Sequence, residues 1–489
     1  MQLRFQVLFT TLSKSTKHIS VFVLGIVMAR MLPIETYGTF LQVQLVVNTL
    51  LYAAIFGIPH SIYYFLPRVR FKRRFILSTA NLMFVLATTV SVTTYFAMPW
   101  ISVKLNNPDL LAFGAIIASM LFFQIPIKIF EPAMISLGKV PLFVVVNATF
   151  NTSFLFVVLT PLILGLSLYV LLLTIVAFYV VQFLAIAVAL TYSTYSAIDD
   201  DDGEDHELVN QLKFSMPIGF SGVIGEVARQ VDKIIISMFF GPYQYAIYTR
   251  GALQIPLLNV ISHSLHNILM PSFTKAVKDE NTPELLRTWH SAIRLMAMFV
   301  YPTFIFFVAT ADMFIPALYS DKYAEASIIF QIYMFTLLRR ITSPNAIIRA
   351  IGKTGILLKM SVFSIFLNVG LTYYLISILG VIGAPIATVA TTYAIFAIYL
   401  NVVSRMLNVP IRELIPWSSL LKFLTMSGAA ILVASSFRLL DIPRLGMLVC
   451  IAFIFGIIYW ALLRRSDALG ETERTALRGI LPRKLRWAI

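Results

Sequence analysis

The chain has few of the side chains on which many enzymes and disulfide-linked proteins depend. It holds one cysteine, Cys450, and six histidines in 489 residues. A single cysteine inside an apolar run excludes a disulfide framework and a cysteine-based zinc site. Gly352-Lys353-Thr354 lacks the upstream glycine of a phosphate-binding loop, and Ser221 does not fit a nucleophile elbow. We therefore expect no enzyme activity, no resident cofactor and no metal centre.

Charge is also scarce. Only 12% of the residues are charged and 59% are hydrophobic, whereas soluble domains are about 25% charged. This composition predicts a polytopic membrane protein with little soluble mass. The formal net charge of +15 does not point to nucleic acid, because no basic block lies in a soluble domain that could dock a duplex.

Long apolar runs fill most of the chain. Since about 20 apolar residues cross a bilayer as a helix, hydropathy predicts an all-α fold of about fourteen transmembrane helices. Their approximate limits are 8–32, 39–66, 75–98, 110–136, 140–163, 167–192, 214–240, 245–270, 291–317, 324–350, 356–378, 381–404, 417–437 and 443–463. Many of these spans contain proline, which favours a transporter with kinked helices over a rigid anchor.

Lysine and arginine concentrate in alternate connections, above all in 68–74, 275–287 and the tail from Arg464 to Arg486. The positive-inside rule therefore places both termini in the cytoplasm. The connection after the sixth span breaks the pattern, because Asp199 to Glu207 is strongly acidic. We interpret it as a solvated linker; the alternative is a cation-sensing or partner-docking segment.

An internal repeat predicts two lobes. LPIETYGTF (32–40) resembles FGPYQYAIY (240–248), and EPAMISLGK (131–139) resembles SPNAIIRAIGK (343–353), both at an offset of about 210 residues. That offset covers six helices, so the repeat is parallel and each lobe keeps the same orientation. The predicted parts are an N-lobe (1–197), an acidic linker (198–213), a C-lobe (214–406), two further helices (407–466) and a basic cytoplasmic tail (467–489).

The span 214–240 carries charge in its middle. Glu226, Arg229, Asp232 and Lys233 are three or four residues apart and share one helix face. Four charges facing lipid would cost about 10 kcal/mol or more, so this face must meet protein or a water-filled cavity. We interpret it as part of a pathway for a polar substrate; the alternative is an ion-pair cluster that pins two helices together.

Other spans carry an excess of cations at similar depth. The candidate substrate-binding cations are Lys128, Arg229, Lys233, Arg250, Arg339 and Arg340, and the candidate charge partners or proton-coupling groups are Glu131, Glu226 and Asp232. Six cations against three carboxylates give a net charge of +3. Arginine grips phosphate through a bidentate fork, so the cavity fits an anionic, phosphate-bearing substrate. Arg339 and Arg340 are adjacent, so we expect one of them to face inward.

His263 and His266 lie three residues apart in the eighth span. We expect them to form a polar stripe that lines a cavity; the alternative is a proton relay.

Short motifs in the right order resemble the polysaccharide-exporter branch of the multidrug/oligosaccharidyl-lipid/polysaccharide flippase superfamily. They include Ala29-Arg30-Met31-Leu32, Val231-Asp232-Lys233-Ile234-Ile235, the Gly-Lys turns at 138–139 and 352–353, and Gly380-Val381-Ile382-Gly383-Ala384. The matches extend over about 400 residues. Pro33, where the family often has glycine, and the acidic linker depart from the pattern.

The resemblance implies a flippase in the bacterial inner membrane. Its substrate would be an undecaprenyl-diphosphate-linked oligosaccharide, an O-antigen or capsular repeat unit, moved by alternating access of the lobes. The candidate cations would bind the diphosphate and acidic sugars, and coupling to H+ or Na+ is left open. The implied partners are membrane lipids, a polysaccharide polymerase and the chain-length machinery. The alternatives are a lipid II flippase, a cation-coupled multidrug exporter of the same superfamily, and a non-transport scaffold for polymerisation.

Overall fold

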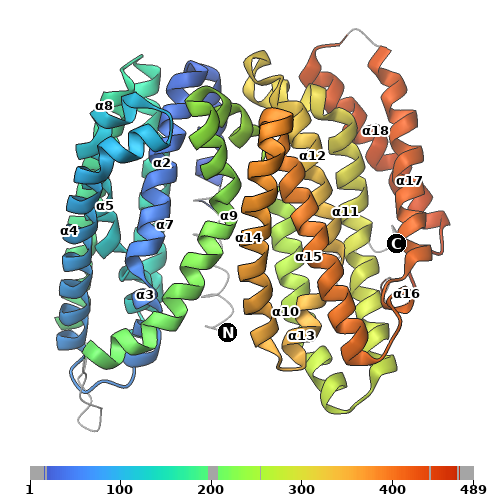
Figure 1. Cartoon of the computed structure of the whole chain (residues 1–489), viewed down its shortest axis with the longest axis horizontal. Helices are drawn as coiled ribbons and strands as arrows, with labels where there is room; N and C mark the ends of the chain where they lie inside the picture. The colour runs from blue at the N-terminus through green and yellow to red at the C-terminus, as the bar shows by residue number, and fades with distance from the viewer. Residues whose placement is uncertain are drawn as a thin grey trace. The chain divides into compact units, whose positions relative to one another are not determined.

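The computed structural model describes residues 16, 19–195, 208–253, 255–439, 442–470 and 473; between 256 and 268 it describes the side chains of 258 and 262 alone. Every element of regular structure in these residues is a helix (Figure 1). The predicted all-α polytopic fold is therefore confirmed. The contacts divide the chain into two units, Met1–Ala246 (unit 1) and Ile247–Ile489 (unit 2).

Unit 1 is a set of long helices that run roughly parallel to one another (Figure 1). After a helix over Ile19–Met31, its elements are α2 (Ile34–Ile55), α3 (Ile58–Phe65), α4 (Lys72–Lys104), η1 (Pro108–Phe113), α5 (Gly114–Ile127), α6 (Phe130–Ser136), α7 (Val140–Ile163), α8 (Leu168–Tyr195) and α9 (Leu208–Gly251). Of α9, the residues up to Ala246 belong to unit 1.

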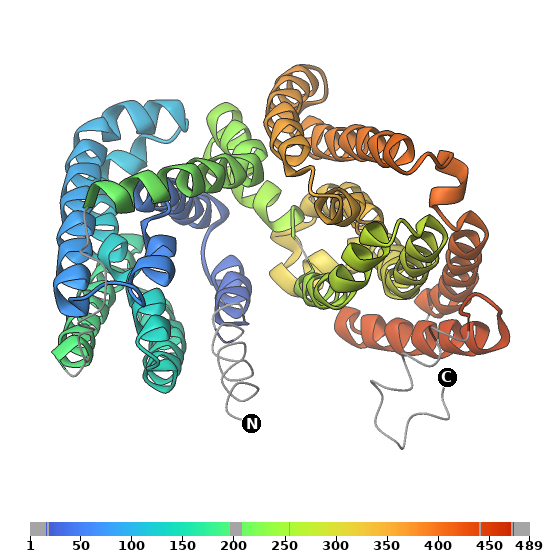
Figure 2. The same ribbon diagram turned by 90° about the horizontal axis from the view of Figure 1, so that it is seen from below.

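Unit 2 continues from the end of α9. Its elements are α10 (Pro256–Lys278), α11 (Thr282–Tyr319), η2 (Asp321–Tyr323), α12 (Ala326–Leu338), η3 (Arg339–Ile341), α13 (Pro344–Ala350), α14 (Thr354–Leu379), η4 (Gly380–Ile382), α15 (Gly383–Leu407), α16 (Ile411–Leu414), α17 (Trp417–Ser435), η5 (Ser436–Leu439) and α18 (Arg444–Arg465). Figure 2 shows these helices from below.

Nine helical segments of the described chain are long and apolar enough to cross a membrane. They coincide with ten of the predicted spans, since the segment Thr354–Leu407 covers both 356–378 and 381–404, so the chain is a multi-pass membrane protein. The described part of the first span, Ile19–Met31, is a shorter apolar helix. The other predicted spans correspond to the charged helix α9, to α10, and to α12 and α13, which are interrupted at Arg339–Ser343.

The label α9 covers two helices that meet at a kink. We expected one span to end at 240 and the next to begin at 245, and the kink at Gly241 lies between these limits. At Gly241 the backbone turns to φ 71° and ψ −168°, a conformation that glycine alone adopts easily, and Pro242 follows. Two helices therefore meet at Gly241, where the predicted boundary between the two spans lies.

Two buried polar clusters and two close backbone contacts hold α9 against unit 1. Near its start, the Gln211 amide donates to Ser61 Oγ (2.9 Å) and Thr79 Oγ1 (3.1 Å). Farther along, Ser237 Oγ accepts a hydrogen bond from Gln42 Nε2 (2.8 Å). A Cβ on Gly219 or Gly38 would collide with the backbone of Phe56 or Pro242. Because of this packing, the contacts group α9 up to Ala246 with unit 1; the predicted division into lobes at 198–213 stays a prediction.

The two halves share one local motif, as the sequence repeat predicted. Helices α6 and α13 each have seven residues and end at a glycine of positive φ, Gly138 (72°) and Gly352 (81°). Each turn closes with the same backbone bonds, from Lys139 N to Met134 O (2.8 Å) and from Lys353 N to Ile348 O (3.2 Å). This is the Schellman end of a helix. In both halves a short helix is thus followed by a long one, α7 or α14.

In unit 2, α17 and α18 pack directly on α11. Tyr459 donates to the carbonyl of Met298 (2.8 Å) in the buried interface, and Arg438 pairs with Asp312 (3.2 Å) near one end of α11. Near the other end, Arg294 Nε donates to Glu473 (2.8 Å), which is fully buried. The C-terminal part of the chain, from η5 to Glu473, is therefore bonded to α11 at several points along its length.

Candidate functional site

The charged middle of α9 has a buried side and an open side. Glu226 is 5% exposed and continues the buried stripe of Gln211, Ser215 and Gly219. Arg229 pairs with Glu226, but its side chain is 64% exposed. Gln230 Nε2 donates to the second carboxylate oxygen of Glu226 (3.1 Å). The carboxylate is thus fixed against the helix, and the guanidinium extends from it into open space.

The open side is widened by glycine. A Cβ placed on Gly222 or Gly225 would meet no atom within 4 Å. These glycines and Arg229 are three and four residues apart, so they lie on one helix face. An anionic group can therefore approach Arg229 closely along the α9 backbone. Arg229 has donors beyond those that Glu226 engages, and a guanidinium binds phosphate oxygens through such a fork.

The next turn of α9 holds the other predicted pair. Asp232 is 5% exposed and Lys233 is half-buried. Asp232 Oδ1 accepts a hydrogen bond from the backbone N–H of Lys233 (2.8 Å). Asp232 is therefore a second buried carboxylate on the same helix.

Lys128 and Glu131 lie where α5 breaks into α6. Pro126 and Pro132 flank the break and supply no backbone N–H. Across the break the backbone N–H groups donate to the carbonyl three residues back instead of four. These bonds run from Lys128 N to Ile125 O (3.2 Å) and from Ile129 N to Pro126 O (3.3 Å). Both predicted side chains are half-buried. Ionisable groups at a discontinuous membrane helix are typical of substrate and ion sites in transporters.

The matching break in unit 2, between α12 and α13, holds more charge than predicted. Arg339 and Arg340 form the 3-10 turn η3 and both are half-buried. Tyr399 of α15 lies close enough to Arg339 and Arg349 for both charges to act on its hydroxyl. Arg349 and Tyr399 were missed by the sequence reasoning. Arg349 stands inside the repeat SPNAIIRAIGK, whereas Tyr399 gave no signal.

Arg250 has a different environment. Its guanidinium carbon lies 5.4 Å from the centre of the Tyr319 ring in unit 2, and the side chain is half-buried. In the buried interior of the same unit, the Tyr248 and Tyr333 hydroxyls are 3.1 Å apart. A cation on an aromatic face is stabilised there. This contact gives Arg250 a packing role within unit 2, beside the substrate role predicted for it.

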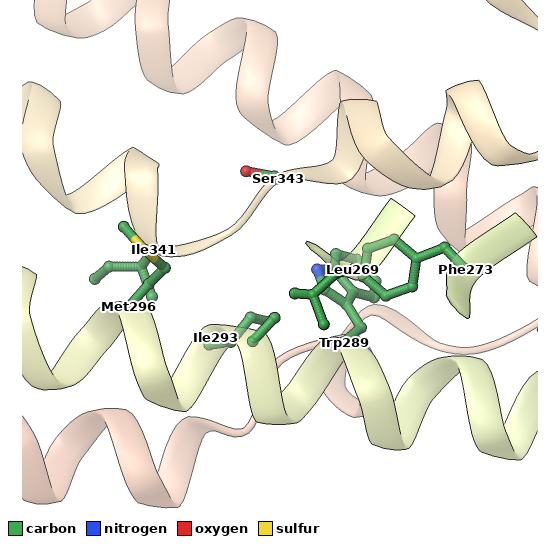
Figure 3. Close-up of a pocket in the computed structure, with 8 residues that line it drawn as sticks. Leu269, Phe273, Trp289, Ile293, Met296, Ile341 and Ser343 are labelled. Atoms are coloured by element: carbon green, nitrogen blue, oxygen red, sulfur yellow. The ribbon is translucent and has the colours of Figure 1, made fainter. Parts of the chain in front are cut away.

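A small cavity lies elsewhere in unit 2, between α10, α11 and the α12–α13 connection (Figure 3). Its free volume is about 20 Å³, room for about one water molecule. The lining is mostly apolar, with Leu269, Phe273, Trp289 and Met296 around it. It is too small and too apolar for a phosphate or a sugar, and it includes none of the predicted site residues.

Two other predictions concern histidines and metals. The side chains of His263 and His266 lie outside the described residues, so the proposed stripe or relay stays a prediction. In the described part of the chain, no three His, Cys, Asp or Glu residues come together as metal ligands.

A comparison with models of protein families identifies the family of this chain. Residues 27–328, more than half of its length, match the family model described as polysaccharide biosynthesis protein. The chain belongs to the polysaccharide biosynthesis protein family. The resemblance to a polysaccharide-exporter branch drawn from short motifs is thereby confirmed. A comparison with curated proteins gives no match for this family member.

Solved structures show the fold of this polysaccharide biosynthesis protein. It is similar to the lipid II flippase MurJ, with a TM-score of 0.68 at 13% identity over 93% of this chain and 98% of that one. It also resembles a multidrug resistance MATE family transporter of the MOP superfamily (0.59, 15%, 80% and 94%). A MOP superfamily transporter from Pyrococcus furiosus is a third match (0.54, 14%, 83% and 95%). At these identities the matches establish the fold, and the site residues stay predictions.

Proposed function

We propose that the protein is a flippase that moves a polyprenyl-diphosphate-linked oligosaccharide across the bacterial cytoplasmic membrane by alternating access, without converting it chemically. The observation that carries the proposal is the pair on α9, in which a buried Glu226 holds an exposed Arg229. A guanidinium held in this way, on an open helix face inside a span, is ready to bind a diphosphate. Membership of a polysaccharide biosynthesis family supports a glycan as the substrate's other part.

The helix breaks provide the other cations. Lys128 stands at the α5–α6 break in unit 1, and Arg339 and Arg340 stand at the α12–α13 break in unit 2. An alternating-access transporter needs binding groups on both of its halves, so that each conformation retains some of them. We propose that Lys128, Arg229 and Lys233 of unit 1 and Arg250, Arg339 and Arg340 of unit 2 are the substrate-binding cations.

The three carboxylates have a separate role in this proposal. Glu226, Asp232 and Glu131 keep the neighbouring cations in place when no substrate is bound. Exchange of a proton or of Na+ at these carboxylates would couple transport to an ion gradient. An inside-negative potential also favours outward movement of the diphosphate, by about 2.3 kcal/mol per charge per 100 mV.

The proposal includes the location and partners of the protein. We propose that both termini are cytoplasmic, as the lysine and arginine distribution predicts, and that the repeat unit passes to a polysaccharide polymerase with its chain-length machinery. O-antigen, capsular and exopolysaccharide units share the polyprenyl diphosphate, so any of them fits the proposed cations.

Deleting the gene tests the substrate. We expect lipid-linked oligosaccharide to accumulate on the cytoplasmic leaflet and surface polysaccharide to be lost, both measured by mass spectrometry of extracted lipids and by polysaccharide staining. A matched strain that carries an empty replacement cassette at a neutral locus is the control. An unchanged lipid-linked pool with new sensitivity to cationic dyes would contradict the proposal and favour a multidrug exporter.

A lipid II flippase is the second candidate, since the fold matches MurJ over 93% of this chain. Lipid II also carries a diphosphate, so the same cations serve either substrate. The same deletion separates the two candidates. Accumulation of lipid II with arrested cell-wall synthesis would support the second, and normal growth with lost surface polysaccharide would support the first.

A further inference from the structure

Helix α12 breaks just before two of the arginines that we assign to the substrate. It ends at Leu338, and Arg339 and Arg340 open the 3-10 turn η3. In a continuing α-helix the backbone N–H of Arg339 would donate to the carbonyl of Phe335, four residues earlier. It donates instead to the carbonyl of Leu337. The break therefore releases the Phe335 carbonyl, which needs another donor because it lies inside a predicted span.

Tyr393 of α15 supplies that donor. Its hydroxyl donates to the Phe335 carbonyl (2.8 Å), although 58 positions of sequence separate the two residues. The ring of Phe335 is held by a different helix, since Phe304 of α11 packs edge-on against it with the ring centres 5.0 Å apart. The main chain and the side chain of Phe335 are thus fixed by two neighbouring helices. Arg339 follows this fixed residue by about one helical turn.

The connection from η3 to α13 is loosely packed on one side. Ile341 and Ser343 border the cavity of about 20 Å³ that this connection forms with α10 and α11 (Figure 3). The hydroxyl of Thr342 is buried and has no hydrogen-bond partner among the described residues. Arg339 and Arg340 are also close enough for one charge to act on the other, and like charges repel. A bond that reaches the end of α12 from α15 therefore matters for the direction in which these arginines leave the helix.

We infer that Tyr393 is a positioning residue, which fixes the end of α12 and thereby directs the guanidinium groups of Arg339 and Arg340. The inference rests on the proposed function, in which these arginines are substrate-binding cations. A guanidinium binds phosphate through a planar fork, so its orientation decides how well it binds. Tyr399, further along α15, lies near enough to Arg339 for the charge to act on its hydroxyl. The same helix therefore reaches both the freed carbonyl and the guanidinium.

Tyr459 offers a matched control. Its hydroxyl donates to the Met298 carbonyl at the same distance (2.8 Å), but it lies on α18, which packs on α11 and α17. Tyr393→Phe and Tyr459→Phe each remove one hydroxyl–carbonyl bond, so both should fold and lose a similar amount of thermal stability in detergent. If Tyr393 only satisfied a buried carbonyl, neither variant would change substrate binding.

Binding of undecaprenyl diphosphate to the purified full-length protein tests the inference, with native mass spectrometry as the readout. We expect Tyr393→Phe to weaken binding about three- to tenfold, as the loss of one hydrogen bond predicts, and Tyr459→Phe to change it by less than about twofold. In Arg339→Gln/Arg340→Gln, which should bind the lipid more weakly, the addition of Tyr393→Phe should have little further effect. A positioning residue acts only through the groups that it positions, and a double-mutant cycle measures this dependence.

Two results would overturn the inference and leave the arginines in the site. One is binding by Tyr393→Phe within about twofold of the native protein while Arg339→Gln/Arg340→Gln loses binding. The other is an equal loss from Tyr393→Phe with and without the arginines, or from Tyr459→Phe, which would show a general loss of stability. A different result, native binding by Arg339→Gln/Arg340→Gln, would remove the arginines from the site, so the proposed assignment of these cations would fail and the inference with it.

Discussion

Separating the structural and the functional role of Arg229 is the sharpest test of the α9 pair. Replacing Arg229 with Gln removes the exposed guanidinium and leaves the buried Glu226 with Gln230 as its hydrogen-bond donor. An exposed ion pair is worth about 0–1 kcal/mol, but a buried carboxylate that loses a partner costs about 1–3 kcal/mol. We therefore expect Arg229→Gln to be less stable by about 1–3 kcal/mol.

The double variant Arg229→Gln/Glu226→Gln removes the buried charge as well. Two glutamines can hydrogen-bond to each other, so we expect the thermal stability in detergent to return close to that of the native protein. Transport should not return. A charge-assisted hydrogen bond to phosphate contributes about 1.5–3 kcal/mol, which predicts a loss of about 10–150-fold in the translocation of lipid-linked oligosaccharide.

Arg229→Lys completes the series, because it keeps the charge but loses the bidentate fork. We expect a transport rate between those of the native protein and the double variant. Translocation would be measured in proteoliposomes at equal protein content, with thermal unfolding recorded on the same samples. Transport by the stable double variant within twofold of the native rate would refute the assignment of Arg229 to the substrate.

Three further predictions concern packing and pH. A Cβ on Gly38 would lie 1.9 Å from the Pro242 carbonyl oxygen, so Gly38→Ala should lower the unfolding temperature, and an unchanged temperature would contradict the α2–α9 contact. Asn107 Nδ2 donates to Gln42 Oε1 (2.6 Å) in a buried cluster; Asn107→Ala should cost about 1–3 kcal/mol in thermal unfolding, more than an exposed Asn→Ala control. Burial raises the pKa of Glu473, but hydrogen bonds from Arg294 and Ser291 outweigh it and lower that pKa below its usual range. The contact between Glu473 and Arg294 therefore stabilises the fold at neutral pH and weakens as the pH falls through the lowered pKa. Proteolysis of the C-terminal segment should accordingly become faster in acid. A proteolysis rate that does not depend on pH would contradict this.

The helices and their order were predictable because the hydropathy of the sequence indicates each membrane span. Each apolar run of about 20 residues must satisfy its backbone internally, and this leaves the helix as the choice. The repeat was predictable too, since the Gly-Lys turns at 138–139 and 352–353 are required by the same helix ending. Such signals are local in the sequence.

Packing between distant residues left no comparable signal. The sequence around Gly241 indicates a boundary between two helices, but it does not show whether a kink or a loop joins them, because glycine and proline serve both. Gln42, Gln211 and Ser237 are ordinary polar residues until α9 is placed beside α2, α3 and α4. The placement of α9 with unit 1 depends on these contacts.

The candidate site was predictable in its residue types and less so in its geometry. The charges on α9 were found from spacing, but which one is buried depends on the neighbouring helices: Glu226 turns inward and Arg229 outward. Tyr399 lies near enough to Arg339 and Arg349 to feel their charge, although 50 to 60 residues of chain separate them. Arg250 lies on Tyr319, and no spacing rule connects these two positions.

The most direct test of the central claim is translocation by the purified protein alone. A polyprenyl-diphosphate-linked oligosaccharide with a cleavable terminal sugar would be placed in proteoliposomes, and an external glycosidase would report the fraction that reaches the outer leaflet. We predict that vesicles with the native protein expose nearly all of the lipid with time, and that protein-free vesicles expose only the outer half. Equal exposure in both, from protein that is folded and correctly inserted, would contradict the flippase account.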